Sequence, residues 1–180
     1  VMSEFEPKPH VTIKEAVAED VREARAMQAR SWLATYPNEE NGVSEEWVRA
    51  RTEHWLAPEV LDKSVERLDA ILHDPTQFYR LAMQHDTVVG FVHLTTKENG
   101  SKYLEAIYTE PSTFGSGVGD TLMKTADAWI GASPVTLEVV RYNARAITFY
   151  QKHGFEMVPD SEHLYADTMP VVYMKRGAHE

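Results

Sequence analysis

Cysteine is absent from the 180-residue sequence. This absence excludes disulfide bonds, thiolate metal sites and a cysteine nucleophile. Basic residues are also few, because 18 lysines and arginines stand against 28 aspartates and glutamates, giving a net charge of −10. An acidic chain of this kind is not expected to bind nucleic acid, and its charge slightly favours a cationic partner.

Long apolar runs are absent too. No run approaches the ~20 residues that a membrane-spanning helix needs, and no apolar signal-peptide core stands at the N-terminus. We therefore expect a cytoplasmic protein with no membrane partner. The eight histidines are scattered, without the H-x-x-x-H spacing that places two ligands on one helix face, so no metal site is expected.

Length and composition are those of one ordinary globular domain. A chain of 180 residues can bury roughly 70% of its unfolded surface, and 43% of the residues are hydrophobic. Residues 1–9 are polar and contain two prolines, which predicts a loose N-terminal arm. The folded domain is expected to span residues 10–180.

The apolar pattern predicts a mixed α/β fold. Strands are expected at 10–17, 78–83, 88–95, 103–109, 135–140, 155–158 and 171–174. Helices are expected at 21–36, 45–55, 60–72, 118–130 and 144–153, with loops at 37–42 and 159–169. Ser44 is a candidate N-cap for the second helix, and Gly131 is placed to end the fourth.

A glycine-spaced loop, GSGVG at 115–119, joins the strand 103–109 to the next helix. Unpaired N–H groups and the positive end of the helix dipole attract anions there, and glycines let a phosphate approach the backbone. The spacing fits neither the dinucleotide motif G-x-G-x-x-G nor a lysine-containing phosphate loop. A simple tight turn before a helix would use the same glycines, so this loop alone decides nothing.

A second pattern lies one strand further along, where residues 141–155 read RYNARAITFYQKHGF. Together with IYTEPSTFGSGVGDTLM upstream, it resembles the GNAT superfamily of acyl-CoA-dependent N-acyltransferases. In that family a Q/R-x-x-G-x-G/A loop precedes an N-x-x-A-x-x-[FL]-Y-x-x-x-G-F helix. The residues that match the second motif in register are Asn143, Ala146, Phe149, Tyr150, Gly154 and Phe155.

The resemblance implies the GNAT fold, a mixed and mostly antiparallel sheet flanked by helices. Two parallel central strands, here 103–109 and 135–140, would splay apart to admit coenzyme A. Acetyl-CoA is the implied cosubstrate, and backbone N–H groups in the first of these strands would stabilise the oxyanion. The residues implied to bind acetyl-CoA are Ile107, Tyr108, Thr109, Phe114, Gly115, Ser116, Gly117, Val118, Gly119, Asn143 and Tyr150.

One residue departs from the family pattern, and another adds a negative charge close to the glycine loop. Phe114 stands where the family usually has Gln or Arg, and Asp120 adds a negative charge to the first helical turn. Backbone N–H groups do most of the phosphate binding, so we expect coenzyme A to bind with altered tightness. Asn143 could bind coenzyme A, cap the helix that follows it, or do both.

Tyr150 is the implied proton donor to the leaving thiolate. A phenol with a pKa near 10 stays protonated at neutral pH. The alternative is a tyrosine that only packs beside Ile147 and Phe155.

The base that accepts the amine proton has two candidates besides water. Strand alternation places Glu105 on the face of Ile107 and Thr109, where burial would raise its pKa. Glu138 on the neighbouring strand is the competitor. Either carboxylate could instead be solvated or ion-paired.

Acceptor specificity is expected from the first helices and their loop. Trp32 and Tyr36, with Glu39 or Glu40, would suit a cationic amine through charge and cation–π attraction. The same residues could also be an acidic loop beside a packed tryptophan.

The sequence thus predicts an N-acetyltransferase. It would transfer acetyl from acetyl-CoA to a primary amine, on a small molecule or a peptide, by direct attack in a ternary complex. The alternative is a non-catalytic acyl-CoA-binding or sensor module, which Phe114 and Asp120 favour and Tyr150 opposes. Many relatives dimerise, so a homodimer is a further expectation of the resemblance.

Overall fold

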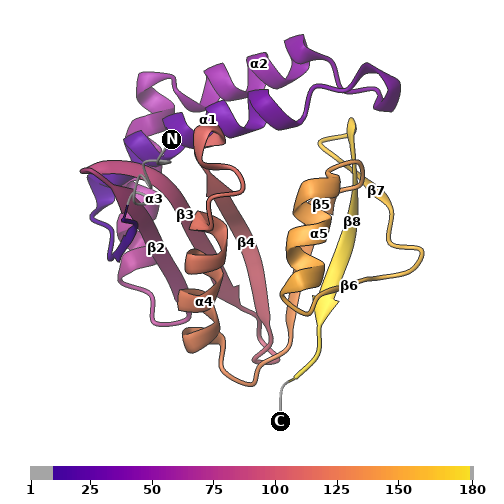
Figure 1. Ribbon diagram of the computed structural model, residues 1–180. Helices are drawn as coiled ribbons and strands as arrows, with labels where there is room; N and C mark the ends of the chain where they lie inside the picture. Colours follow the sequence, from indigo (N-terminus) through magenta and orange to yellow (C-terminus); the bar gives the residue numbers. More distant parts are fainter. Residues whose placement is uncertain (1–9, 179–180) are drawn as a thin grey trace, which may run out of the picture.

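The computed structural model describes residues 10–178, and the predicted loose arm at 1–9 lies outside them. Eight strands form one sheet in the order β1-β2-β3-β4-β5-β8-β6, with β7 paired to β8 (Figure 1). The strands are β1 (Thr12–Lys14), β2 (Gln77–Gln84), β3 (Thr87–Thr96), β4 (Lys102–Thr109), β5 (Val135–Val140), β6 (Glu156–Met157), β7 (His163–Tyr165) and β8 (Met169–Arg176).

Helices cover both faces of this sheet. They are α1 (Val21–Thr35), α2 (Glu45–Trp55), α3 (Pro58–Leu72), α4 (Val118–Ile130) and α5 (Ala144–Lys152). Strand alternation separates two cores: Phe78 of β2 packs with α4, whereas Tyr79 and Leu81 pack with α1 and α3 on the other face. A third cluster joins Trp32 and Val48 of the first two helices to β5 and β8.

The two central strands part, as the resemblance implied. β4 and β5 run parallel but pair over only three positions, which end at Leu104 opposite Leu137. Beyond these, β4 pairs only with β3 and β5 only with β8. Figure 1 shows β4 and β5 diverging toward α1. The other strand pairs in the sheet are antiparallel, so the predicted mixed, mostly antiparallel sheet with two splayed parallel strands is confirmed.

A β-bulge in β4 contradicts one expectation. Ala106 pairs with His93 and Leu104 with Leu94, which leaves Glu105 as an extra residue without a cross-strand partner. The bulge breaks the alternation, so Glu105 faces α1 and α3 together with Ala106, whereas Ile107 packs toward α4. Glu105 is also exposed. The prediction of a buried Glu105 on the face of Ile107 is therefore wrong.

The remaining differences are the ends of several elements, such as β8 at 169–176 instead of 171–174, and one additional short strand. β1 is shorter than the expected strand at 10–17, and the expected loop at 159–169 contains β7. β7 forms a hairpin with β8 through Ala166 and Asp167, whose φ angles are 48° and 58°. Asp167 is a common residue in such turns, but Ala166 is not, so the sequence signal for the hairpin is weak. No helix within residues 10–178 is both long and apolar enough to cross a membrane.

Candidate active site

A cavity of about 820 Å³ fills the opening between β4 and β5. Its walls come from these strands, from α1, from the loop that precedes α4 and from α5. Most of the residues predicted from the sequence line it. They are Trp32, Tyr36, Glu105, Ile107, Tyr108, Thr109, Phe114, Gly115, Gly117, Val118, Gly119, Asn143 and Tyr150. Ser116 does not line the cavity, because its hydroxyl turns back to donate to the Thr113 carbonyl.

The loop before α4 presents free donors to this cavity. Gly115 and Gly117 have φ angles of 80° and 95°, a left-handed conformation that side chains disfavour, and Gly117 caps α4. Within residues 10–178, no group accepts a hydrogen bond from the backbone N–H of Gly117, Val118 or Gly119. These N–H groups are therefore available to an anion at the positive end of the helix dipole.

Gly119 has a different role from Gly117. A Cβ atom at Gly119 would lie 3.2 Å from Cε2 of Phe149 on α5, whereas one at Gly117 would meet nothing within 4 Å. The absence of a side chain at position 119 thus lets α4 pack closely on α5. Only the glycines at 115 and 117 are required by the backbone conformation of the loop itself.

The negative charge of Asp120 is compensated from α5. Its carboxylate lies 2.8 Å from Nζ of Lys152 and 2.8 Å from Nε2 of His153. The hydrogen bond from Lys152 is the main reason that the pKa of Asp120 lies below its ordinary value. The first turn of α4 therefore does not carry an isolated negative charge toward an anionic ligand.

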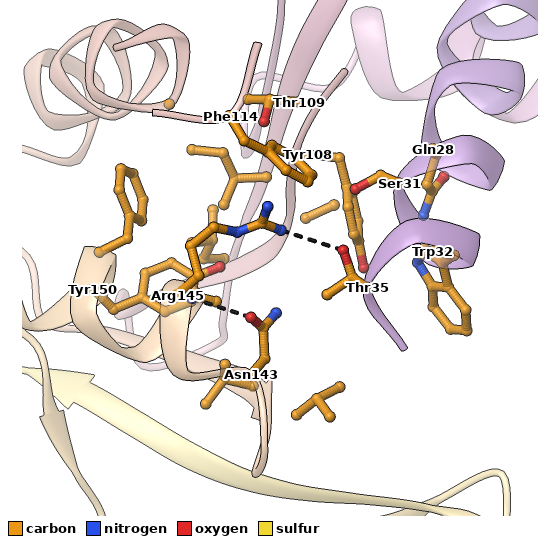
Figure 2. Close-up of a pocket in the computed structure, with 18 of the residues that line it drawn as sticks. Gln28, Ser31, Trp32, Thr35, Tyr108, Thr109, Phe114, Asn143, Arg145 and Tyr150 are labelled. Atoms are coloured by element: carbon orange, nitrogen blue, oxygen red, sulfur yellow. Dashed lines mark hydrogen bonds between the residues drawn. The ribbon is translucent and has the colours of Figure 1, made fainter. Parts of the chain in front are cut away.

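Arg145 is a cavity residue that the sequence interpretation missed. It starts from the first turn of α5, and Figure 2 shows its side chain crossing the cavity toward α1. Nη2 donates to the Thr35 hydroxyl at 3.2 Å, and Cζ lies 3.3 Å from the ring centroid of Phe114. A guanidinium group thus lies beside the position where the family usually carries Gln or Arg.

Tyr150 lies on α5 and faces the same cavity (Figure 2). Its side chain is buried and packs edge-on against Phe149 and Phe155. Burial raises the pKa of the phenol, so the hydroxyl stays protonated at neutral pH. No residue of the described chain forms a hydrogen bond with this hydroxyl, so its proton remains available to a group in the cavity.

The ends of α5 agree with the sequence motif. The Asn143 side chain accepts a hydrogen bond from the Ala146 N–H at 3.2 Å, which confirms its N-cap role. Gly154 has a φ of 89°, and the Phe155 N–H donates to the Tyr150 carbonyl at 3.0 Å. No residue among 10–178 forms a hydrogen bond with the amide NH₂ group of Asn143, so this group is available to a ligand in the cavity.

Both carboxylates proposed as bases line the cavity, in different surroundings. Glu105 accepts a hydrogen bond from the Thr95 hydroxyl at 2.9 Å. Glu138 lies 3.2 Å from Nε2 of His163 on β7, whose pKa is raised by hydrogen bonds to Ser161 and Glu138. Glu138 is therefore held in an ion pair whenever His163 is protonated, whereas Glu105 has no cationic partner within 4 Å in the described chain.

The wall of the cavity formed by α1 and its neighbours is aromatic. Trp32 contacts Tyr36, Trp55 and Tyr165, with ring centroids 4.8, 4.7 and 6.1 Å apart. Arg25 and Gln28, one helical turn apart on α1, complete this wall. Glu39 and Glu40 do not line the cavity. No group of three metal-binding side chains occurs among residues 10–178.

A protein-family model for the acetyltransferase (GNAT) family matches residues 21–155. The chain belongs to this family. The matched region contains the glycine loop at 115–119, both splayed strands and all of α5. No curated protein matches the chain.

Solved GNAT structures share the fold. One is a PaiA N-acetyltransferase from Thermoplasma acidophilum in complex with coenzyme A, with a TM-score of 0.72 at 22% identity over 93% of this chain and 99% of that one. A GNAT acetyltransferase from Streptococcus pneumoniae has a TM-score of 0.72 at 21% identity, covering 94% and 100%. The ribosomal-protein-S18-alanine N-acetyltransferase from Escherichia coli has a TM-score of 0.63 at 16% identity, covering 95% and 96%.

Proposed function

We propose that this GNAT protein transfers the acetyl group of acetyl-CoA to a primary amine by direct attack in a ternary complex. The observation that carries the proposal is the protonated, unpartnered hydroxyl of Tyr150 in the same cavity as the free N–H groups at Gly117–Gly119. One end of this cavity suits a pyrophosphate and the middle suits a thioester. Coenzyme A bound to the PaiA enzyme agrees with this use of the fold.

Different residues of the chain have different roles in the proposed reaction. The loop N–H groups bind the pyrophosphate, and the Asn143 amide contacts the pantetheine. Backbone N–H groups near Ile107 and Thr109 hold the thioester carbonyl and stabilise its oxyanion. Trp32 and Tyr36 line the route of the incoming amine. Bound acetyl-CoA supplies an activated acyl group on a thiolate that leaves readily.

The proton steps follow from these positions. The neutral amine nitrogen forms a bond to the carbonyl carbon and gives up its proton to Glu105, directly or through water. The C–S bond then breaks, and the Tyr150 hydroxyl donates its proton to the thiolate. Glu138 is the competing base, but its pairing with His163 makes it the weaker candidate. The products are an N-acetylated amine and free coenzyme A.

A non-catalytic acyl-CoA-binding module is the second candidate. Phe114 and Asp120 favoured it, but Asp120 is paired with Lys152 and His153, and Arg145 lies over Phe114. These contacts weaken both arguments for it. The two functions are distinguished by measuring whether amines cause release of free thiol from acetyl-CoA.

Arg145 is expected to contribute to coenzyme A affinity. Arg145→Gln should raise the Kd for acetyl-CoA about threefold to tenfold, because a guanidinium next to the phosphate loop forms charge-assisted hydrogen bonds. Calorimetric titration measures this change. Arg141→Gln is the control, since Arg141 lies nearby but bonds to Asn41 and Glu162 outside the cavity. Equal affinity in the Arg145 variant and the parent would remove Arg145 from the phosphate site.

Glu105 is expected to assist removal of the amine proton. Glu105→Gln should lower kcat about tenfold at neutral pH, and the rate should partly recover at high pH, where the free amine is abundant. A pH–rate profile of parent and variant measures this, with Glu98→Gln in an exposed turn as the control. An unchanged profile for Glu105→Gln, with a loss in Glu138→Gln, would assign the base to Glu138.

A further inference from the structure

A second, smaller cavity of about 250 Å³ adjoins the main one. It lies between α1, α3 and the face of the sheet that α4 does not cover. Four residues line both cavities, namely Arg25, Gln28, Glu105 and Ala106. The β-bulge of β4 therefore lies at the junction, and a small molecule in the main cavity can extend into the side cavity.

Arg25 at this junction has no carboxylate partner. Nη1 donates to Oε1 of Gln28 at 3.0 Å, and Cζ lies 5.4 Å from the Trp55 ring centroid. Within residues 10–178, no carboxylate lies within 4 Å of the Arg25 guanidinium. The side chain is half-buried, and this burial, together with the like charge of Arg67, lowers its pKa.

Arg67 adds to this unbalanced charge. It belongs to α3, lines the side cavity and likewise forms no ion pair within the described part of the chain. Arg67 is exposed, so water screens part of its repulsion with Arg25, and an anion bound in the side cavity that both residues line would reduce this repulsion further. Among residues 10–178, six other arginines pair with carboxylates, as Arg22 does with Glu19 and Asp62, whereas Arg51 and Arg145 do not.

A pyrophosphate at the loop before α4 would not account for this second cationic position. Arg145, beside the phosphate loop, contacts Thr35 at the end of α1, and Arg25 lies ten residues earlier on that helix. Ten residues correspond to about 15 Å of helix. A pyrophosphate bound at the loop would therefore leave the Arg25 end of the cavity without an anionic partner.

We infer that Arg25 and Arg67 bind a carboxylate of the acceptor, so that the substrate class is amines that also carry a carboxylate, such as free amino acids. The inference rests on the proposed acetyltransferase activity. It differs from the cationic acceptor that the net charge favours. Glu105 lies at the junction between the cavities, where it can attract the ammonium group of such a substrate while Arg25 binds its carboxylate.

The test compares acceptors that differ only in the anionic group. Free amino acids are assayed against their own carboxamides, and lysine also against 1,5-diaminopentane, by release of thiol from acetyl-CoA. The best amino acid should exceed its carboxamide at least fivefold in kcat/KM. Arg25→Gln should abolish this preference by raising KM for the amino acid. KM for acetyl-CoA should stay unchanged. Arg22→Gln, an exposed variant on the same helix, should behave as the parent.

Three results would overturn the inference, and they differ in what else they affect. If carboxamides or diaminopentane were acetylated with the same kcat/KM as the amino acids, a carboxylate site would be excluded. The proposed acetyltransferase activity would not be affected by this result. An Arg25→Gln variant that keeps the preference, with a parent-like melting temperature, would place the carboxylate elsewhere. Calorimetric binding of acetyl-CoA without thiol release on any amine would instead contradict the acetyltransferase proposal itself.

Discussion

Replacing Tyr150 with phenylalanine is expected to lower kcat roughly tenfold to several hundredfold. General acid catalysis is typically worth about 10²–10⁴-fold, and a thiolate leaves readily, so the loss should fall at the lower end. KM for acetyl-CoA should change little, because the hydroxyl acts mainly in the transition state. Steady-state thiol release by parent and variant, on an amine that the parent acetylates, measures this effect.

Tyr150→Phe should remove the hydroxyl without disturbing the packing of the ring. The ring packs against Phe149 and Phe155, and the hydroxyl has no hydrogen-bond partner in the described chain, so stability should be nearly unchanged. Tyr173→Phe on β8 is the matched control, because Tyr173 does not line the cavity. Turnover in Tyr150→Phe equal to the parent's would make Tyr150 a packing residue and remove the proposed proton donor.

Replacing Gly117 with aspartate is expected to weaken acetyl-CoA binding at least tenfold, which corresponds to about 1.4 kcal/mol. The new carboxylate would stand beside N–H groups that are proposed to bind the pyrophosphate. Gly117→Asn has nearly the same shape and tolerates the same left-handed backbone, so the difference between the two variants isolates the charge. Calorimetric titration of both with acetyl-CoA measures it.

A second control for this loop is Gly100→Asp. Gly100 has a φ of 84° and open space around its Cβ position, but it lies in the turn between β3 and β4. The Gly100 variant should bind acetyl-CoA as the parent does. Equal affinities of folded Gly117→Asp and Gly117→Asn would show that no phosphate lies at this loop.

The fold could be predicted largely because its signals are local. Helix caps such as Ser44 and Asn143 stand immediately before their helices and are confirmed by their hydrogen bonds. The parting of β4 and β5 came from the family resemblance, since no local pattern encodes where two strands stop pairing. β7 was missed because a three-residue strand depends on its partner β8 rather than on its own sequence.

The backbone elements that form the site could be predicted from the sequence. The contacts of its charged side chains could be predicted less well. Asp120 pairs with residues 32 and 33 positions away, so its compensation follows only from how α4 packs on α5. Arg145 and Phe114 meet in the same way. The position of Glu105 was predicted wrongly because one unpaired residue in β4 reverses the alternation.

Amine-dependent release of thiol from acetyl-CoA by the purified protein is the decisive test of the proposed acetyltransferase activity. The mass of the amine product should be determined in the same reaction. Thiol release should require the amine, and one acetylated amine should form for each thiol released. Tight binding of acetyl-CoA with no amine-dependent release and no acetylated product, across amino acids, carboxamides and diamines, would contradict this activity and favour the non-catalytic module.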